Sequence, residues 1–159
     1  MKLALAQINP TIGDLPGNAA RIARALDRAR AGGADLAVLP ELSVCGYRPR
    51  DLLMVEGFVE ACVRAAAEIG ERHTPGLTVV IGVPLPGAHG SVANGLLVYR
   101  DGRRVAEYRK RLLPTYDVFD EDRYFVPGAG AVVVEAAGRR VGLAICEDLW
   151  RGEDAGFAR

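Results

Sequence analysis

The sequence has no net charge and few cysteines. Its 20 Lys and Arg residues balance 20 Asp and Glu residues, which argues against nucleic acid as a partner, because phosphate binding depends on an excess of basic side chains. The three cysteines, Cys45, Cys62 and Cys146, are odd in number and not closely paired. This favours reduced thiols in a cytoplasm over a disulfide framework.

Long apolar runs and metal-ligand clusters are also missing. The opening ten residues are broken by polar side chains and a proline before the apolar region of a secretion signal can form. Residues 74–99 have no charged side chain, but prolines and glycines divide them into pieces far shorter than the ~20 residues of a membrane helix. His73 and His89 have no Cys or His at ligand spacing. We therefore expect a cytoplasmic protein without a membrane partner or a metal.

What the sequence does have is the pattern of one folded α/β domain. Half of its 159 residues are hydrophobic, enough for a core of its own. An apolar run at 2–8, a helical stripe from Ala19 to Ala29 and a second apolar run at 35–40 predict a β-α-β unit. A second helical stripe, from Val55 to Ile69, leads to a buried strand at 77–83.

The second part of the chain predicts antiparallel hairpins. Asp101-Gly102 separates the apolar runs 96–99 and 105–108, and this dipeptide is favoured in two-residue hairpin turns. Ala137-Gly138 separates 132–134 from 141–145 in the same way. Together the elements predict an α/β fold in which helices cover at least one face of a mixed sheet.

Three reactive side chains follow predicted strands: Glu41, Lys110 and Cys146. Binding and catalytic sites gather at such strand ends in α/β sheets. A carboxylate that accepts a thiol proton, a thiolate that attacks a carbonyl and an ammonium that stabilises the oxyanion can together perform acyl transfer. The acids next to Cys146 raise a thiol pKa, so an active Cys146 needs a base in contact with it.

Each of these residues also has a purely structural interpretation. Glu41 is a suitable acid for the N-terminus of a helix, and Lys110 lies in the charged run Tyr-Arg-Lys-Arg, which is typical of a solvated strand end. A single cysteine is most often a small buried apolar residue, and this interpretation fits Cys45 and Cys62 best. Spacing alone does not decide between the two interpretations.

Three ordered motifs resemble the nitrilase, or carbon-nitrogen hydrolase, superfamily. They are Leu-Pro-Glu-Leu at 39–42, Tyr-Arg-Lys-Arg-Leu-Leu at 108–113 and Ala-Ile-Cys-Glu-Asp at 144–148. The opening Ala-Gln-Ile-Asn-Pro, with Gly13-Asp14 and Asn18, is similar to the first strand and turn of that superfamily. The resemblance implies a nitrilase-like αββα sandwich and a Glu-Lys-Cys triad formed by Glu41, Lys110 and Cys146.

Within the superfamily, residues 46–53 and 113–121 look most like the glutaminase domain of glutamine-dependent NAD synthetases, although Arg48 and Arg50 replace a proline and an acid that are typical there. The resemblance implies that Glu121 supports the lysine and that Tyr116 lines a glutamine pocket. The implied activity is amide hydrolysis that releases ammonia without a cofactor. A synthetase domain, absent from residues 1–159, would use the ammonia, ATP and deamido-NAD to make NAD.

The chain ends 13 residues after Cys146, whereas nitrilase-like domains continue well beyond their cysteine motif. Residues 1–159 are therefore expected to be the N-terminal part of a single hydrolase domain, with an incomplete sandwich. Three alternatives follow: a glutaminase, another nitrilase-type amidase that acts on a small amide, and a truncated fragment that is not catalytic and serves as an interaction module. The resemblance also favours a homo-oligomer.

Overall fold

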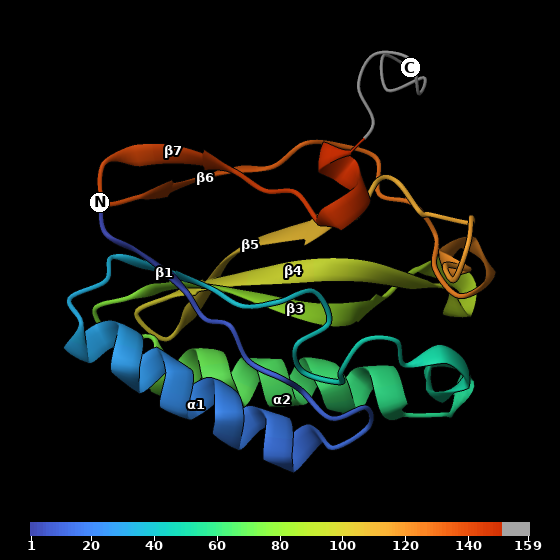
Figure 1. Cartoon of the computed structure of the whole chain (residues 1–159), viewed down its shortest axis with the longest axis horizontal. Coiled ribbons are helices and arrows are strands. Elements are labelled where there is room, and N and C mark those ends of the chain that lie inside the picture. Colours follow the sequence, from blue (N-terminus) through green and yellow to red (C-terminus); the bar gives the residue numbers. More distant parts are fainter. Residues whose placement is uncertain (151–159) are drawn as a thin grey trace.

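The computed structural model describes residues 1–150, so the last nine residues of the predicted domain lie outside the described part. The chain forms three layers (Figure 1): a pair of helices, a five-stranded sheet and a two-stranded sheet. The helices and strands are β1 (Leu3–Leu5), α1 (Leu15–Ala31), β2 (Leu36–Val38), α2 (Phe58–His73), β3 (Thr78–Pro86), β4 (Val92–Arg100), β5 (Arg103–Arg109), β6 (Val133–Ala136) and β7 (Arg139–Gly142).

The five-stranded sheet is mixed and has the strand order β1-β2-β3-β4-β5. β1, β2 and β3 pair in parallel, as the predicted β-α-β alternation requires. β4 then returns antiparallel to β3, and β5 returns antiparallel to β4. Consequently β2, β3 and β5 run in the same direction and end at the same edge of the sheet.

Both faces of this sheet are covered, by different layers. α1 and α2 pack on one face around a core that includes Ile22, Leu26 and Ile81. The β6–β7 hairpin packs on the other face, where Val134 and Ile145 lie in one cluster with residues of β2, β3, β4 and β5. The predicted mixed sheet with covering helices is therefore confirmed, and the hairpin adds the third layer as a separate sheet.

The first helix is fixed at its N-terminus by side chains. Asp14 caps it by accepting a hydrogen bond from Gly17 N at 2.9 Å, which satisfies one of the free amides of the first turn. The fully buried Asn18 donates to the carbonyls of Thr11 and Val44 and accepts from Thr11 N. Asn18 thereby ties α1 to the loop before it and to the segment that follows Glu41.

The boundaries of the elements correct the sequence prediction at three points. Val55 does not belong to the second helix: it is 55% exposed, because α2 begins only at Phe58, after Gly57. The strand predicted at 141–145 ends at Gly142, and the strand predicted at 2–8 is limited to Leu3–Leu5. Both predicted hairpin turns are confirmed, with positive φ at Asp101 and Gly102 and at Ala137 and Gly138.

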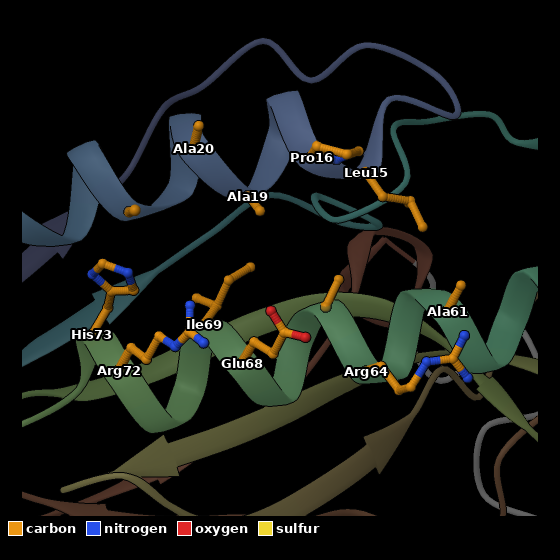
Figure 2. Close-up of a pocket in the computed structure, with 12 residues that line it drawn as sticks. Leu15, Pro16, Ala19, Ala20, Ala61, Arg64, Glu68, Ile69, Arg72 and His73 are labelled. Carbon is orange, nitrogen blue, oxygen red and sulfur yellow. The ribbon is translucent and has the colours of Figure 1, made fainter.

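A groove of about 420 Å³ lies between α1 and α2. Figure 2 shows that short side chains such as Ala19 and Ala61 line it, together with the charged Arg64, Glu68 and Arg72. Neither Glu41, Lys110 nor Cys146 contributes to this groove. As for membranes, neither helix in residues 1–150 has the length and apolar character needed to cross a bilayer.

Candidate active site

The carboxyl-terminal edge of the five-stranded sheet brings Glu41 and Lys110 together. Glu41 follows β2 after Leu39 and Pro40, and Lys110 directly follows β5. Because β2 and β5 run in the same direction, both residues leave the sheet at the same edge. The contact was not visible in the sequence, since it depends on the strand order.

Lys110 is a buried cation held between two carboxylates. Its side chain is 0% exposed, and Nζ lies 2.7 Å from Glu41 Oε1 and 2.8 Å from Glu121 Oε2. Burial disfavours the charged form, but the charges and hydrogen bonds of the two glutamates outweigh it, so the pKa of Lys110 is raised. The structure thus contradicts the interpretation of Lys110 as a solvated strand end.

Glu41 is positioned by a second donor besides the lysine. Asn94 lies on β4 and is fully buried, and its Nδ2 donates to Glu41 Oε1 at 2.6 Å. Within residues 1–150 the other oxygen, Oε2, has no hydrogen-bond partner and is available to a proton donor. No helix begins at Glu41, so the alternative of a helix N-terminal acid is wrong.

A glycine allows the Glu41 segment to lie directly on the sheet. A Cβ built on Gly82 of β3 would be 2.3 Å from Pro40 O and 2.6 Å from Leu42 N. The backbone amide of Val44 also donates to Gly82 O at 3.2 Å. Any larger residue at position 82 therefore displaces the backbone on both sides of Glu41.

Cys146 reaches the same edge from the second sheet. It begins a 3₁₀ turn, Cys146–Leu149, that follows β7, and it is exposed. Its φ of 44° lies in the left-handed region, which is strained for a residue with a side chain. Together with Glu41 it lines a cavity of about 230 Å³ whose other walls are mainly apolar.

The charges of Glu41 and Lys110 both affect the pKa of the Cys146 thiol. Burial and the negative charge of Glu41 raise the pKa of the thiol, and the positive charge of Lys110 lowers it. The net result is a pKa above the usual thiol value, the direction expected from the acids next to it in the sequence. Cys45 and Cys62, by contrast, are both 0% exposed members of the core.

Glu121 lies on the other side of the lysine. It is 3% exposed, and its Oε1 also accepts a hydrogen bond from the Tyr47 hydroxyl at 3.0 Å. Burial raises the pKa of the Glu121 carboxyl, while Lys110 pulls it down; the balance is a raised pKa. The structure therefore places Glu121 where it contacts and orients the lysine.

Tyr116 lies beside the residue that follows the cysteine. Its hydroxyl donates to Glu147 Oε2 at 2.8 Å, and its ring packs edge-on against Phe119. Tyr116 is half exposed, whereas Glu147 is buried. Tyr116 is thus tied to the residue that follows Cys146, but it is not among the residues that line the cavity of Glu41 and Cys146.

Three residues that support the site, Asn94, Tyr47 and Asp148, were not predicted from the sequence. Asn94 lies within a hydrophobic strand, and Tyr47 is more than 70 positions from its partner Glu121. Asp148 was recognised only as an acid of the cysteine motif, yet it binds backbone amides on both sides of the site. Nothing in local spacing marks Asn94 or Tyr47, because each acts across strands or loops that are distant in sequence.

The site combines a buried ammonium held between two carboxylates with a cavity that Glu41 and Cys146 line, in an α/β fold of two packed sheets. The chain belongs to the carbon-nitrogen hydrolase family, whose pattern matches residues 2–156. The nitrilase-like fold expected from the motifs is therefore confirmed.

More particularly, the chain is similar to the glutaminase part of glutamine-dependent NAD⁺ synthetases. It is 40% identical over 157 residues to the enzyme of that name from Synechocystis, covering 95% of this chain and 28% of the relative. The structure of the Acinetobacter baumannii synthetase in complex with ADP superposes with a TM-score of 0.87 at 36% identity, over 93% of this chain and 28% of that one. The chain thus spans little more than a quarter of the length of these relatives.

A smaller relative has the same fold. An amidase from Nesterenkonia sp. AN1 matches with a TM-score of 0.80 and 28% identity, over 93% of this chain and 56% of its own. Its structure shows the acetamide moiety of fluoroacetamide added covalently at the active-site cysteine.

Proposed function

We propose that this chain carries the catalytic centre of a glutamine amidohydrolase, with Cys146 as nucleophile, Glu41 as general base and Lys110 as oxyanion stabiliser. The observation that supports it best is the buried Lys110, which contacts Glu41 at 2.7 Å beside the cavity that Glu41 and Cys146 line. A lysine is rarely buried without a partner, and the positive charge of Lys110 also acts on the Cys146 thiol, whose pKa it lowers. The similarity to NAD⁺ synthetases supports glutamine as the amide.

The first half of the reaction forms a thioester. Glu41 takes the proton of the Cys146 thiol, and the thiolate attacks the side-chain carbonyl carbon of glutamine. Lys110 and a backbone N–H hold the resulting oxyanion. Nζ donates to Glu41 Oε1 and to both oxygens of Glu121, so the oxyanion takes the place of one of the two contacts with Glu121. The C–N bond then breaks, and Glu41 returns the proton to the departing ammonia.

The second half releases glutamate. Glu41 removes a proton from water, which attacks the thioester, and the proton then returns to the departing Cys146 sulfur. General acid–base assistance of this kind contributes about 10²–10⁴-fold, and one oxyanion donor contributes about 2.7–4 kcal/mol. Glu121 keeps Lys110 charged and fixed, and Tyr116, whose hydroxyl donates to Glu147 next to Cys146, is proposed to contact the bound glutamine. No cofactor takes part in these steps.

By analogy with these relatives, the ammonia is proposed to pass to a synthetase domain that amidates deamido-NAD at the expense of ATP. This step is based on the relatives, which are named NAD⁺ synthetases and are more than three times as long as this chain. Glutamine would then be the small-molecule substrate of the present chain and the synthetase domain its partner.

Ammonia release from glutamine by the purified chain tests the proposal, with Cys146→Ala as the control. We expect release that depends on Cys146. A rate no higher than that of Cys146→Ala would contradict independent catalysis by residues 1–159. Carbamoylputrescine and α-ketoglutaramate serve as competing amides: faster hydrolysis of either one would reject glutamine as the substrate but retain the amidase chemistry.

The Nesterenkonia amidase favours a second candidate, an amidase that acts on another small amide, because its fold is matched here and its own active-site residue is a cysteine. A third candidate, an interaction module without catalysis, is favoured by apolar side chains on the strands that are exposed to solvent. Leu5 is 73% exposed and Val133 is 50% exposed, and exposed apolar strand surfaces promote association. Size-exclusion chromatography combined with the ammonia assay distinguishes an inactive, associating chain from an active one.

A further inference from the structure

The carboxylate of Asp148 accepts four hydrogen bonds, two on each oxygen. Oδ1 accepts from the backbone amides of Arg111 and Leu112, both at 3.0 Å. Oδ2 accepts from Ile145 N at 2.9 Å and from the Tyr108 hydroxyl at 2.6 Å. A hydrogen bond to a charged acceptor is stronger than one between neutral groups, so the Asp148 carboxylate binds its four donors strongly.

The four donors come from two different layers of the fold. Tyr108 is on β5, and Arg111 and Leu112 follow Lys110 where β5 ends. Ile145 directly precedes Cys146, in the segment that comes from β7 of the second sheet. Asp148 therefore joins the backbone next to the lysine to the backbone next to the thiol.

The same carboxylate closes the turn that carries the thiol. Asp148 N donates to Ile145 O at 3.0 Å, while Asp148 Oδ2 accepts from Ile145 N. Between these reciprocal bonds lies Cys146, with its φ of 44°. A conformation of this kind costs about 1–3 kcal/mol and persists only where surrounding contacts enforce it.

We propose that Asp148 is a positioning residue that holds the Cys146 thiol in register with Glu41 and Lys110, an inference that rests on the proposed function for its catalytic consequence. Asp148 does not act as the base, because both of its oxygens are already occupied by donors that belong to the scaffold. Its effect is on the place and direction of Sγ. A misplacement of about 1 Å reduces catalysis by on the order of 10²-fold.

Asp148→Asn tests this role. The asparagine Oδ1 keeps the acceptor for Arg111 N and Leu112 N, but its amide nitrogen cannot accept from Ile145 N. Tyr108→Phe is a milder second variant, which leaves the three backbone bonds and the buried ring in place. Asp27→Asn is the matched control, because Asp27 forms an exposed ion pair with Arg30 on α1.

The main readout is the pH profile of Cys146 alkylation by iodoacetamide, localised by peptide mass mapping, which needs no turnover of glutamine. For Asp148→Asn we expect the profile to move toward that of an ordinary exposed thiol, because Sγ leaves the neighbourhood of Glu41. We also expect a kcat for glutamine lower by about 100-fold, with KM changed less than threefold. Tyr108→Phe shifts the profile less and in the same direction, and Asp27→Asn does not shift it.

An Asp148→Asn protein that melts cooperatively and retains the wild-type alkylation profile would overturn the proposal. If Asp148→Asn does not fold, Tyr108→Phe decides: an unchanged profile rejects the role and a shifted one supports it. A wild-type chain that releases no ammonia, but whose alkylation profile shifts in Asp148→Asn, rejects the proposed function and keeps Asp148 as the residue that positions the thiol.

Discussion

Lys110 Nζ lies 2.7 Å from Glu41 Oε1, although 69 positions separate the two residues in the chain. Glu121 holds the same nitrogen from the other side, so one buried cation is shared between two carboxylates. The stability of the fold and the proposed catalysis therefore depend on the same side chain. Lys110 is expected to stabilise an oxyanion, and its charge also offsets the charge of the carboxylates beside it.

Lys110→Met is expected to affect both properties. Removal of one partner from a buried ion pair costs about 3–5 kcal/mol, which urea denaturation measures. Loss of an oxyanion donor lowers kcat by about 10²–10³-fold. The double variant Lys110→Met/Glu121→Gln regains part of the stability, because the buried charge is gone, but regains no activity. Lys2→Met, at the other lysine of the chain, is the control; if it matches Lys110→Met in either assay, the prediction is wrong.

Glu41→Gln separates the ionisation of the thiol from catalysis. After burial, the negative charge of Glu41 is the strongest of the influences that raise the pKa of Cys146, and Lys110 lowers it. In Glu41→Gln the alkylation of Cys146 therefore reaches its midpoint at a lower pH, since a neighbouring negative charge is gone. Lys110→Met moves the midpoint to a higher pH.

Hydrolysis in Glu41→Gln is nevertheless expected to fall by about 10²–10⁴-fold, because the proposed general base is lost. Shifts of the alkylation midpoint in the same direction for both variants would contradict the electrostatic assignment. The exposed Cys146 is the reporter, while Cys45 and Cys62 are buried and are followed separately by peptide mapping.

Gly82→Ala is expected to displace Glu41. The new Cβ would lie 2.3 Å from Pro40 O, so the backbone of the Glu41 segment has to move. Such overpacking costs about 1–3 kcal/mol, and a thermal melt together with the ammonia assay should show lower stability and lower kcat. Gly130→Ala is the matched control, because no atom lies within 4 Å of the added Cβ; an equal loss in both variants would argue against the close approach as the cause.

Asn18→Ala is expected to weaken the fold without altering any group that reacts. It removes the three hydrogen bonds that the fully buried Asn18 makes with the backbone of Thr11 and Val44, besides one that it accepts from Arg21, and it leaves the backbone partners unsatisfied. The expected loss is roughly 3 kcal/mol, at about 1 kcal/mol for each bond. Asn9→Ala, at an exposed position, should stay within about 0.5 kcal/mol of the wild type in the same urea titration.

The elements that local chemistry determines were predictable. Asp101-Gly102 and Ala137-Gly138 adopt positive φ at both positions, as tight hairpin turns require. The helical stripe between Ala19 and Ala29 is buried at Ile22, Leu26 and Ala29. The prediction that Val55 belongs to the second helix was wrong, also for a local reason. Gly57 caps α2, so the helix begins later than the apolar spacing indicated.

The candidate site was predictable only as a set of residues, through the family resemblance. The charge of Lys110 in the run Tyr-Arg-Lys-Arg indicates a solvated strand end, and its burial depends on Glu41 and Glu121, which lie in other segments. Similarly, the support of Glu41 by Asn94 depends on β4 lying next to β3 and β5. Strand order is a property of the whole sheet, so no local pattern contains it.

The order of the layers along the chain has a consequence for biosynthesis. All five strands of the larger sheet are complete at Arg109, so the carboxylate of Glu41 and the ammonium of Lys110 are translated before the thiol. About 36 positions separate Lys110 from Cys146, which a ribosome covers in roughly 2–7 s at about 5–20 residues per second. Cys146, the proposed nucleophile, is therefore the last of the three side chains to be synthesised, and every strand of the larger sheet precedes it in the chain.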